Sequence, residues 1–328
     1  MRVIKPTVEL YSPVERENIL KHIERCGRVC YKSEDRITDD SAPKFVSGII
    51  KRGHEAVLEH GSFIFELNKL SFTDLTTILT SLEHDGFRSF LRITCDSRPV
   101  VSGNIRAWRD FLRACSENYF IPAYMRDFLT ENKILFPEFQ SNEMYVEYLG
   151  FDDVKFEPLS ICDLREGIEQ LTHIDMTAHF IVDRGVSHEI VRHRPASFCQ
   201  ESTRYCSYIK DKFGNEITVI LPLFFDTGMG TASNSLVYDC WKTSCERDEA
   251  AYFKLLEYGA TPQQARSVLP SSLKTEVMMT TNLAEWMHFL KLRCSPAAHP
   301  QMVEVAIPLL KQFTEKFPNV FNDIEVEK

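Results

Sequence analysis

The sequence predicts an α+β fold, built as a single domain that carries an insertion. Apolar residues at helical spacing mark several helices, and short runs rich in β-branched and aromatic residues mark strands between them. No internal repeat, low-complexity tract or linker rich in Gly and Ser divides the chain of 328 residues. The stretch from about 86 to 170 is hard to assign, and residues 139–157 within it are acidic and irregular. We therefore expect one domain with a surface excursion, and not two clean domains.

The first half of the chain begins with a well-marked helix. Ser12 is placed to cap it, and Glu15 completes a capping box ahead of apolar residues that start at Ile19. The further elements expected in this half are a helix that follows residues 41–43 and ends at Gly53, a strand over 62–67, a helix over 72–84 capped by Ser71, and an amphipathic helix over 105–115.

The second half alternates strands and helices. The expected elements are a strand over 176–186 that ends at Gly185, a short helix over 187–193, a strand over 218–221, a helix over 235–258 closed by Gly259, a helix from Thr261 that stops at Pro270, a strand over 276–281, and two final helices over 282–293 and 303–317.

Composition excludes several classes of protein. The net charge of −9 means that the chain as a whole does not attract nucleic acid or anionic membranes. No apolar run approaches the ~18 residues of a membrane-spanning helix, and the N-terminus lacks the apolar core of a secretory signal. Ten cysteines without a CxxC pair indicate reduced thiols in a cytoplasmic protein. Cys26 and Cys30 have a spacing that fits a metal pair or core packing, and the lack of a second pair favours packing.

The densest candidate for chemistry is the segment 187–205, SHEIVRHRPASFCQESTRY. Between 184 and 210, five basic residues stand against two acidic ones, a surplus of three positive charges in an acidic chain. Arginine forks match phosphate oxygens, and Ser197, Ser202 and Thr203 supply hydroxyl donors. The pattern predicts an anion site, with a solvated basic loop as the alternative.

Other signatures of catalysis are absent from the sequence. His188 and His193 resemble a zinc-protease HExxH, but they are five residues apart, about 140° around a helix, and cannot share a metal. Arg192 occupies the position where the second ligand would lie. The single GxG, at 228–230, lacks its third glycine, and neither GxxxxGK[ST] nor GxSxG occurs. A zinc hydrolase, a Rossmann fold and a P-loop protein are therefore not expected.

At this point the chain resembles the flavin-dependent thymidylate synthases, the ThyX family. Arg192, His193 and Arg194 are followed by seven residues and then Ser202, which matches the signature RHRx7S. Four further segments match family segments in the same order: GHEAVLEH at 53–60 with the strand-like residues after it, ARSVLP at 265–270, NLAEWMHFLKLR at 282–293, and HPQ at 299–301. The matches span residues 10–70 and 175–318.

The resemblance implies a ThyX-like single domain over 1–328. It would have a mixed sheet flanked by helices and a mainly helical insertion at about 71–174, and it would assemble as a homotetramer with shared active sites. The implied enzyme is an FAD-dependent methyltransferase that converts dUMP to dTMP. Methylenetetrahydrofolate would donate the carbon, NADPH would reduce the flavin, and tetrahydrofolate would be released. Neither nucleic acid nor a membrane is an implied partner, and no metal is implied.

The resemblance also assigns site residues. The flavin contacts that it implies are Arg192, His193, Arg194, Gln200, Asn282 and His288, with Ala56 beside them. The substrate contacts that it implies are Glu189, Ile190, Val191, Arg192, Gln200, Glu201, Ser202, Thr203, Arg204, Arg266 and Arg293, with His54 at the mouth of the flavin and folate pocket.

Two of these residues have expected roles in the reaction. Arg293 is the expected catalytic residue, because the matching arginine is thought to polarise the uracil at N3, where a fixed cation stabilises developing charge. Ser202 is better explained as a phosphate ligand than as a nucleophile, since the sequence marks no general base as its partner.

The chain departs from the family at several positions. Ala56 replaces a small hydroxyl residue, and Ala284 and His288 replace Arg and Asn found in some members. The segment 102–109, SGNIRAWR, resembles one in the longer members. Arg106 and Arg109 in this segment either reach a ligand or lie on a packing helix, and the amphipathic pattern favours packing.

Three alternative functions stay open. They are another flavin-dependent or nucleotide-modifying activity on the same scaffold, an RNA-binding module built on the RHR island, and an inactive structural homologue. The acidic net charge counts against RNA binding, and the intact arginines count against inactivity. An absorption spectrum separates a flavoprotein from an RNA binder or a zinc hydrolase, because oxidised flavin colours the purified protein yellow.

Overall fold

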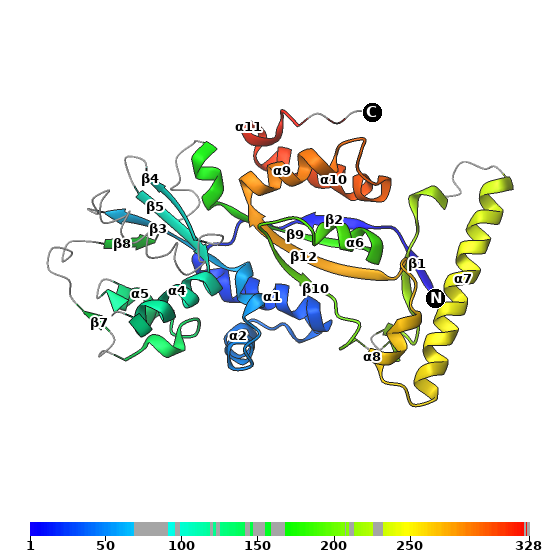
Figure 1. Cartoon of the computed structure of the whole chain (residues 1–328), viewed down its shortest axis with the longest axis horizontal. Coiled ribbons are helices and arrows are strands. Elements are labelled where there is room, and N and C mark those ends of the chain that lie inside the picture. The colour runs from blue at the N-terminus through cyan, green and yellow to red at the C-terminus, as the bar shows by residue number, and fades with distance from the viewer. Residues whose placement is uncertain are drawn as a thin grey trace.

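The computed structural model describes residues 1–68, 91–95, 99–118, 121–122, 125–141, 145–146, 155–158, 168–206, 208–209, 213–225, 232–324 and 326 (Figure 1). The expected helix over 72–84, its cap Ser71 and the GxG at 228–230 lie outside the described residues, as does much of the acidic stretch 139–157. In the described ranges, no helix is both long enough and apolar enough to cross a membrane.

The centre of the molecule is a four-stranded antiparallel sheet with the order β10-β12-β9-β2. Its strands are β2 (Thr7–Leu10), β9 (Asp175–Asp183), β10 (Ser197–Gln200) and β12 (Lys274–Asn282). Strand β12 is buried after its first residue, and its alternate side chains serve opposite faces. Met278 packs in one hydrophobic cluster, whereas Val277 and Met279 pack in the other. The sheet therefore needs cover on both faces.

Helices supply that cover on each side (Figure 1). The helices of one face are α9 (Leu283–Arg293), α10 (Pro300–Lys316) and α11 (Pro318–Phe321), and those of the other face are α1 (Ile19–Tyr31) and α2 (Ser41–Lys51). Trp286 of α9 is fully buried, and its indole nitrogen donates to the carbonyl oxygen of Met176 on β9 at 3.0 Å. Gly53 and Gly259, each the expected end of a helix, have positive φ angles of 69° and 90°.

Strands of the insertion pair with β3, which precedes the insertion, to form a second sheet with the order β4-β5-β3-β8. The elements here are β3 (Ser62–Asn68), β4 (Leu91–Cys95), β5 (Pro99–Asn104), α4 (Ile105–Asn118), α5 (Arg126–Glu131) and β8 (Lys155–Pro158), with a short parallel pair of β6 (Ile121–Pro122) and β7 (Tyr145–Val146). Phe65 packs edge-on against Trp108 and Phe128, with ring centroids 5.3 and 4.8 Å apart. The described part of the insertion thus holds strands as well as the expected helices.

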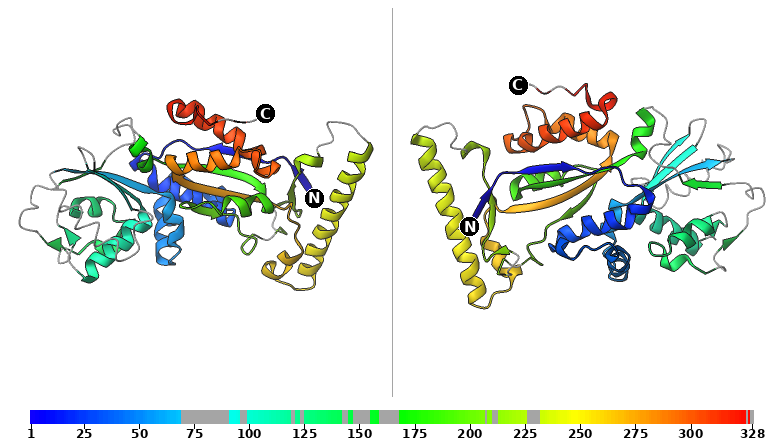
Figure 2. Two further views of the ribbon diagram at one scale, coloured as in Figure 1. Left: turned by 45° about the horizontal axis from the view of Figure 1, so that its top comes forward. Right: turned by 180° about the vertical axis from the view of Figure 1, so that it is seen from behind.

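A third group of elements lies at the other end of the molecule, where both views of Figure 2 place α7 opposite the insertion. It consists of β1 (Arg2–Ile4), β11 (Thr218–Ile220), α7 (Ala232–Glu257) and α8 (Pro262–Ala265). Strands β1 and β11 pair in parallel. Among the described strands, parallel pairing is confined to such short pieces, so the expected mixed sheet is divided into antiparallel sheets and parallel pairs.

Most expected elements appear within a few residues of their predicted bounds, but two local predictions were wrong. The first helix does not begin at Ser12: Glu15 has an extended backbone, and α1 follows a short 3₁₀ turn. Strand β9 ends at Asp183, because its Oδ1 accepts a hydrogen bond from the Val186 N–H and caps α6 (Arg184–Ile190). The segment 197–200, to which the sequence assigned no element, is strand β10.

Candidate functional site

Segments that are far apart in the sequence meet around α6 and the turn after it. Gln200 of β10 donates from Nε2 to the Ser187 hydroxyl of α6 at 3.0 Å and to the Thr275 hydroxyl of β12 at 3.2 Å. Arg293, the last residue of α9, contacts Glu189 near the end of α6. Helix α6 therefore joins β10, β12 and α9, which carry the predicted site residues Gln200, Asn282, His288 and Arg293.

Arg293 is held against α6 by one charged and one backbone contact. Its Nη1 lies 3.1 Å from Oε2 of Glu189, and its Nη2 donates to the Glu189 carbonyl oxygen at 3.1 Å. Its Nε is buried and has no hydrogen-bond partner among the residues that the structure describes. The cation is thus fixed in place by these two contacts.

The histidine of the RHR sequence is enclosed. His193 packs against the rings of His288 and Phe289, with centroids 5.5 and 5.4 Å away, and its Nε2 lies 3.4 Å from Oε2 of Glu285. Burial and the nearby His288 and Arg293 lower the pKa of His193 to about 4. The imidazole is therefore neutral at pH 7.

The two arginines of the RHR sequence are exposed. Nη1 of Arg194 donates to the carbonyl oxygens of Val191 and His193, at 2.6 and 2.7 Å, and the guanidinium lies 5.4 Å from the ring of Phe198. Ile190, in contrast, is fully buried in the apolar core, so only its backbone is free to meet a ligand.

Two further arginines converge on the loop after β10. The buried hydroxyl of Thr203 accepts from Nη2 of Arg184 at 3.3 Å and from Nη1 of Arg266 at 3.4 Å. The neighbouring Ser202 is fixed by its backbone N–H, which donates to the carbonyl oxygen of Cys30 at 3.1 Å, and its hydroxyl accepts from the Arg204 N–H at 3.3 Å. The loop is thus hydrogen-bonded at both residues and lies beside a pair of cations.

Behind this loop lies a buried charged cluster that the sequence did not reveal. Glu201 is buried and pairs with Nζ of Lys274 at 2.8 Å. Glu276 accepts from Lys32, Lys274 and His179 at 2.8, 2.6 and 3.0 Å. Although burial raises the pKa of Glu276, the His179 hydrogen bond and the two lysines outweigh it and hold the pKa well below its usual range. Burial raises the pKa of Glu201. The buried side chain of Glu201 thus points toward Lys274.

The 53–60 segment approaches the same loop through aromatic residues. His54 is exposed, and its Nδ1 lies 3.0 Å from the Tyr31 hydroxyl. The ring of Tyr31 packs 5.4 Å from that of Tyr205, which follows Arg204. Ala56 is also exposed, in the 3₁₀ helix η3 (Glu55–His60).

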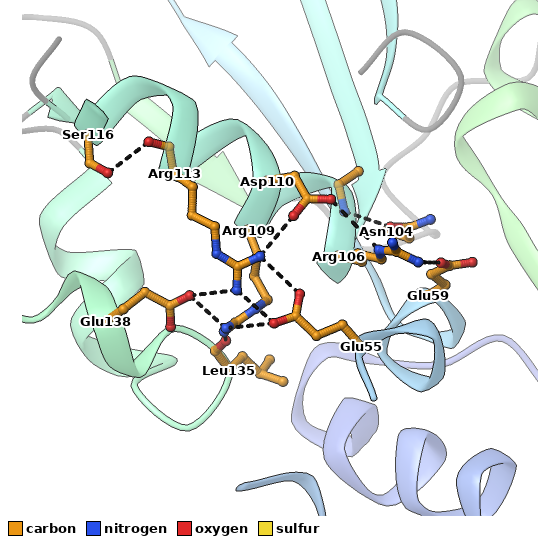
Figure 3. A network of polar contacts seen from close by, with 11 residues as sticks. Glu55, Glu59, Asn104, Arg106, Arg109, Asp110, Arg113, Ser116, Leu135 and Glu138 are labelled. Carbon is orange, nitrogen blue, oxygen red and sulfur yellow. Dashed lines mark hydrogen bonds and ion pairs between the residues drawn. The ribbon is translucent and has the colours of Figure 1, made fainter. Parts of the chain in front are cut away.

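Arginines of helix α4, in the insertion, form ion pairs with glutamates of η3 (Figure 3). Arg109 is buried and lies 3.3 Å from a Glu55 oxygen and 2.6 Å from a Glu138 oxygen. Arg113 donates to both Glu55 oxygens, at 3.0 and 2.7 Å. Arg106 pairs with Glu59 of η3 at 2.7 Å. The packing role expected for Arg106 and Arg109 is confirmed, because both join α4 to neighbouring elements.

A cavity of about 240 Å³ lies between the insertion and the central sheet. Its walls include Pro195 after the RHR sequence and Asn282 and Ala284 at the start of α9. The Oδ1 of Asn282 accepts from the Glu285 N–H at 2.9 Å, which caps α9. The cavity therefore adjoins the positions that the resemblance assigns to flavin.

The sequence missed Arg184, Lys32 and Lys274 as members of this region. Arg184 lies in the basic segment 184–210, so the count of charges in that segment already pointed to it. The two lysines have no comparable cluster of basic residues around them in the sequence. Cys26 packs in the hydrophobic core, as expected. In the part of the chain that the structure describes, no group of three or more His, Cys, Asp or Glu is arranged to hold a metal ion.

Comparison with known proteins places this arrangement in context. The family described as thymidylate synthase complementing protein matches residues 14–80 and 168–319. Relatives named flavin-dependent thymidylate synthase include one from Geobacter sulfurreducens, 29% identical over 53% of this chain and 75% of the relative. Others are from Corynebacterium efficiens, 32% identical over 44% of this chain and 60% of the relative, and Pyrococcus furiosus, 30% identical over 40% and 51%. The alignments to the last two thus span between half and two thirds of the relative's length.

Proposed function

The chain belongs to the family of the thymidylate synthase complementing protein, and from that premise we propose that it is a flavin-dependent thymidylate synthase. Such an enzyme is an FAD-dependent methyltransferase that converts dUMP to dTMP. Methylenetetrahydrofolate donates the carbon, NADPH serves as the reductant, and tetrahydrofolate is released.

One observation carries the proposal beyond the sequence match. Arg184 and Arg266, which are 82 residues apart in the sequence, both donate to the hydroxyl of Thr203. Two guanidinium groups held beside a hydroxyl-rich loop suit a phosphate, because arginine forks bind phosphate oxygens in a bidentate way. We assign this place to the phosphate of dUMP, with Gln200 to Arg204 forming the loop around it.

Ser202 fits the same assignment. The described part of the chain gives its hydroxyl no carboxylate or imidazole partner, and the hydroxyl accepts from the Arg204 N–H. A serine without a general base is a weak nucleophile, whereas its O–H can donate to a phosphate oxygen. Ser202 therefore binds the substrate and forms no covalent bond to it.

Arg293 takes the electrostatic role. Its guanidinium is fixed by Glu189 and keeps a buried Nε without a partner among the described residues. A cation that is already oriented stabilises negative charge on the uracil ring without further reorganisation. The backbone of Glu189 to Arg192, beside it, completes the contacts to the base.

The residues around the cavity fit FAD. Arg192 and Arg194 are exposed cations for an anionic cofactor, and neutral His193 offers a hydrogen-bonding group without a charge. Asn282, His288, Gln200 and Ala56 complete the proposed flavin contacts, and His54 lies at the mouth shared with folate. When bound, FAD supplies the hydride for the methyl group.

The remaining parts of the proposal concern assembly and location. We propose a homotetramer with shared active sites, since Ala56 and His54 are exposed on a single chain and fit an interface. We place it in the cytoplasm because the seven cysteines whose side chains the structure describes are free thiols. The RNA-binding and inactive alternatives are not favoured, given the family match.

The deciding experiment measures dTMP formation from dUMP, methylenetetrahydrofolate and NADPH, with and without added FAD. The proposal requires product that depends on FAD, and a yellow protein after reconstitution. Absence of dTMP from a folded, flavin-loaded protein would reject the assigned reaction.

A further inference from the structure

The first three residues of β12 contact the loop that follows β10 from both faces of the sheet. The Thr275 hydroxyl accepts from Nε2 of Gln200 at 3.2 Å, on the face that α6 covers. Successive side chains of a strand point to opposite faces, so Lys274 and Glu276 point the other way, toward Lys32 at the end of α1. The proposed substrate loop is therefore held against β12 on either side of the sheet.

Lys274 bridges two buried carboxylates. Its Nζ lies 2.8 Å from Oε2 of Glu201, in the loop, and 2.6 Å from Oε1 of Glu276, in the strand. The side chains of Lys274, Glu201 and Glu276 are 13%, 2% and 9% exposed. Ion pairs with so little exposure are screened much less than pairs at the surface. Lys274 therefore ties Glu201 to the strand through charge.

The backbone of the loop is anchored at the same place. The N–H of Glu201 donates to the carbonyl oxygen of Glu276 at 2.8 Å, and the N–H of Ser202 donates to that of Cys30 at 3.1 Å. Ser202 and Thr203, whose hydroxyls we assign to the phosphate, come directly after Glu201 in the chain. The position of Glu201 thus sets where these two hydroxyl groups begin.

Glu201 depends on Lys274 more than Glu276 does. Burial raises the pKa of Glu201 by penalising its charged form, and Lys274 opposes that shift. Glu276 also contacts Lys32 at 2.8 Å and His179 at 3.0 Å. Among the described residues, Lys274 is the one ion-pair partner of Glu201. Loss of Lys274 would therefore leave Glu276 compensated and would free the side chain of Glu201 from the strand.

We propose that Lys274 is a positioning residue for substrate binding: through its ion pair with Glu201 it holds residues 200–204 in the conformation that receives the phosphate of dUMP. This inference rests on the proposed function, because it takes dUMP as the ligand of the loop. Lys274 acts on the ligand through Glu201 and not by contact. A loop that is already ordered before the ligand arrives loses less conformational freedom on binding, so the ion pair raises the affinity for dUMP.

The first test measures the order of the loop in the absence of substrate. Hydrogen–deuterium exchange of the full-length, FAD-loaded protein reports local opening of the backbone. In Lys274→Met, exchange over residues 200–206 should be about tenfold faster than in wild type, because the ion pair no longer opposes opening of the loop. Exchange over α10, which lies on the other face of the sheet, should stay at the wild-type rate.

The second test is calorimetric titration of the same protein with dUMP. A loop that adopts the binding conformation only about one tenth of the time raises the apparent Kd about tenfold, so Lys274→Met should raise the Kd for dUMP by about that factor. The KM for dUMP should rise with it, whereas kcat at saturating dUMP should stay near the wild-type value, because bound substrate selects the same conformation. Lys274→Arg keeps the cation and should bind dUMP nearly as well as wild type.

Further variants separate positioning from general stability. Arg28→Met is the matched control: Arg28 pairs with the buried Glu24 at 2.6 Å within α1, so its loss also leaves a buried carboxylate uncompensated. It should destabilise the protein and leave the Kd for dUMP unchanged. If Lys274→Met does not fold, Glu201→Gln removes the same ion pair from the other end and fills the same space, so it should raise the Kd likewise. Where the double variant folds, the two losses should not add, because both changes break one contact.

The outcomes distinguish this proposal from the proposed function. Wild-type exchange over 200–206, or a wild-type Kd for dUMP, in folded Lys274→Met and Glu201→Gln would overturn the role of Lys274. An equal rise in Kd for Arg28→Met would attribute the loss to general destabilisation and overturn it too. If dUMP binding depends on Lys274 but the wild type forms no dTMP, the assigned reaction fails and the positioning role stands. A wild type that does not bind dUMP would reject both.

Discussion

Replacement of Arg109 by methionine should destabilise the protein strongly, because Arg109 is a buried cation at the centre of the contact between α4 and η3. Its side chain is 2% exposed. It contacts Glu55, Glu138 and the carbonyl oxygen of Leu135 (Figure 3). Methionine has a similar length and restores the apolar contacts of the stem, but it leaves these acceptors without their donor.

The magnitude follows from burial. Removal of one partner from a buried ion pair costs about 3 to 5 kcal/mol, since the remaining charge is left uncompensated. Arg113 still reaches both Glu55 and Glu138, at 2.7 and 3.1 Å, so part of the compensation survives. We therefore expect a loss at the lower end, about 3 kcal/mol.

The assay is equilibrium unfolding in urea, followed by circular dichroism, with Arg16→Met as the matched control. Arg16 also joins the core to the insertion through one glutamate, but the two side chains are 36% and 66% exposed. An exposed pair contributes about 0 to 1 kcal/mol. Arg109→Met/Glu138→Gln should lose less than the sum of its single variants, because the two residues share one interaction.

The comparison can refute the reasoning directly. If Arg109→Met and Arg16→Met shift the unfolding midpoint equally, burial of the α4–η3 network adds nothing to stability. Strictly additive losses for Arg109 and Glu138 would show that the contact at 2.6 Å carries no coupling energy.

Further predictions concern the site and the response to pH. Arg293→Ala should abolish dTMP formation and leave bound flavin largely intact, as judged by turnover and the absorption spectrum; normal turnover would contradict its role. Ser202→Ala should weaken dUMP binding more than it slows the chemical step, and a loss of turnover at unchanged dUMP affinity would contradict the phosphate contact. Burial lowers the pKa of His22 and His173 to about 4 and that of His60 to about 3. Below about pH 6.5 these histidines are therefore protonated in the unfolded chain but stay neutral in the native state. The free energy of unfolding should fall as the pH is lowered from 6.5 to 4, by up to about 1.4 kcal/mol per pH unit for each histidine. His173→Gln should flatten that slope in urea titrations at several pH values, and an unchanged slope would show that His173 does not contribute.

Local sequence signals were sufficient for much of the framework. Periodic apolar residues and the glycines at 53 and 259 located most helices, since these features act within a few turns of one helix. The RHR sequence and the hydroxyl-rich residues after it indicated a candidate site region without any three-dimensional information. The burial of Ile190 shows the limit, because a motif marks a segment and cannot say which side chains face the ligand.

Contacts in the folded chain shifted the boundaries of two elements from those that the sequence predicted. Ser12 and Glu15 satisfy a capping pattern, yet α1 starts later, where Ile19 and Ile23 can pack beneath the sheet. Asp183 ended β9 earlier than the apolar run suggested, because its carboxylate caps α6. In each case a contact that forms only in the folded chain outweighed the local sequence preference for a helix start or a longer strand.

The amino-acid order alone established the mixture of helices and strands, the basic segment 184–210 and the family resemblance, since each rests on patterns within short segments of the chain. Only the tertiary structure placed Arg92 against Asp175 and Lys32 against Glu276, pairs separated by 83 and 244 residues. Ion pairs of this kind depend on distance and burial in space, and an isolated arginine or lysine in the sequence carries no mark of its distant partner.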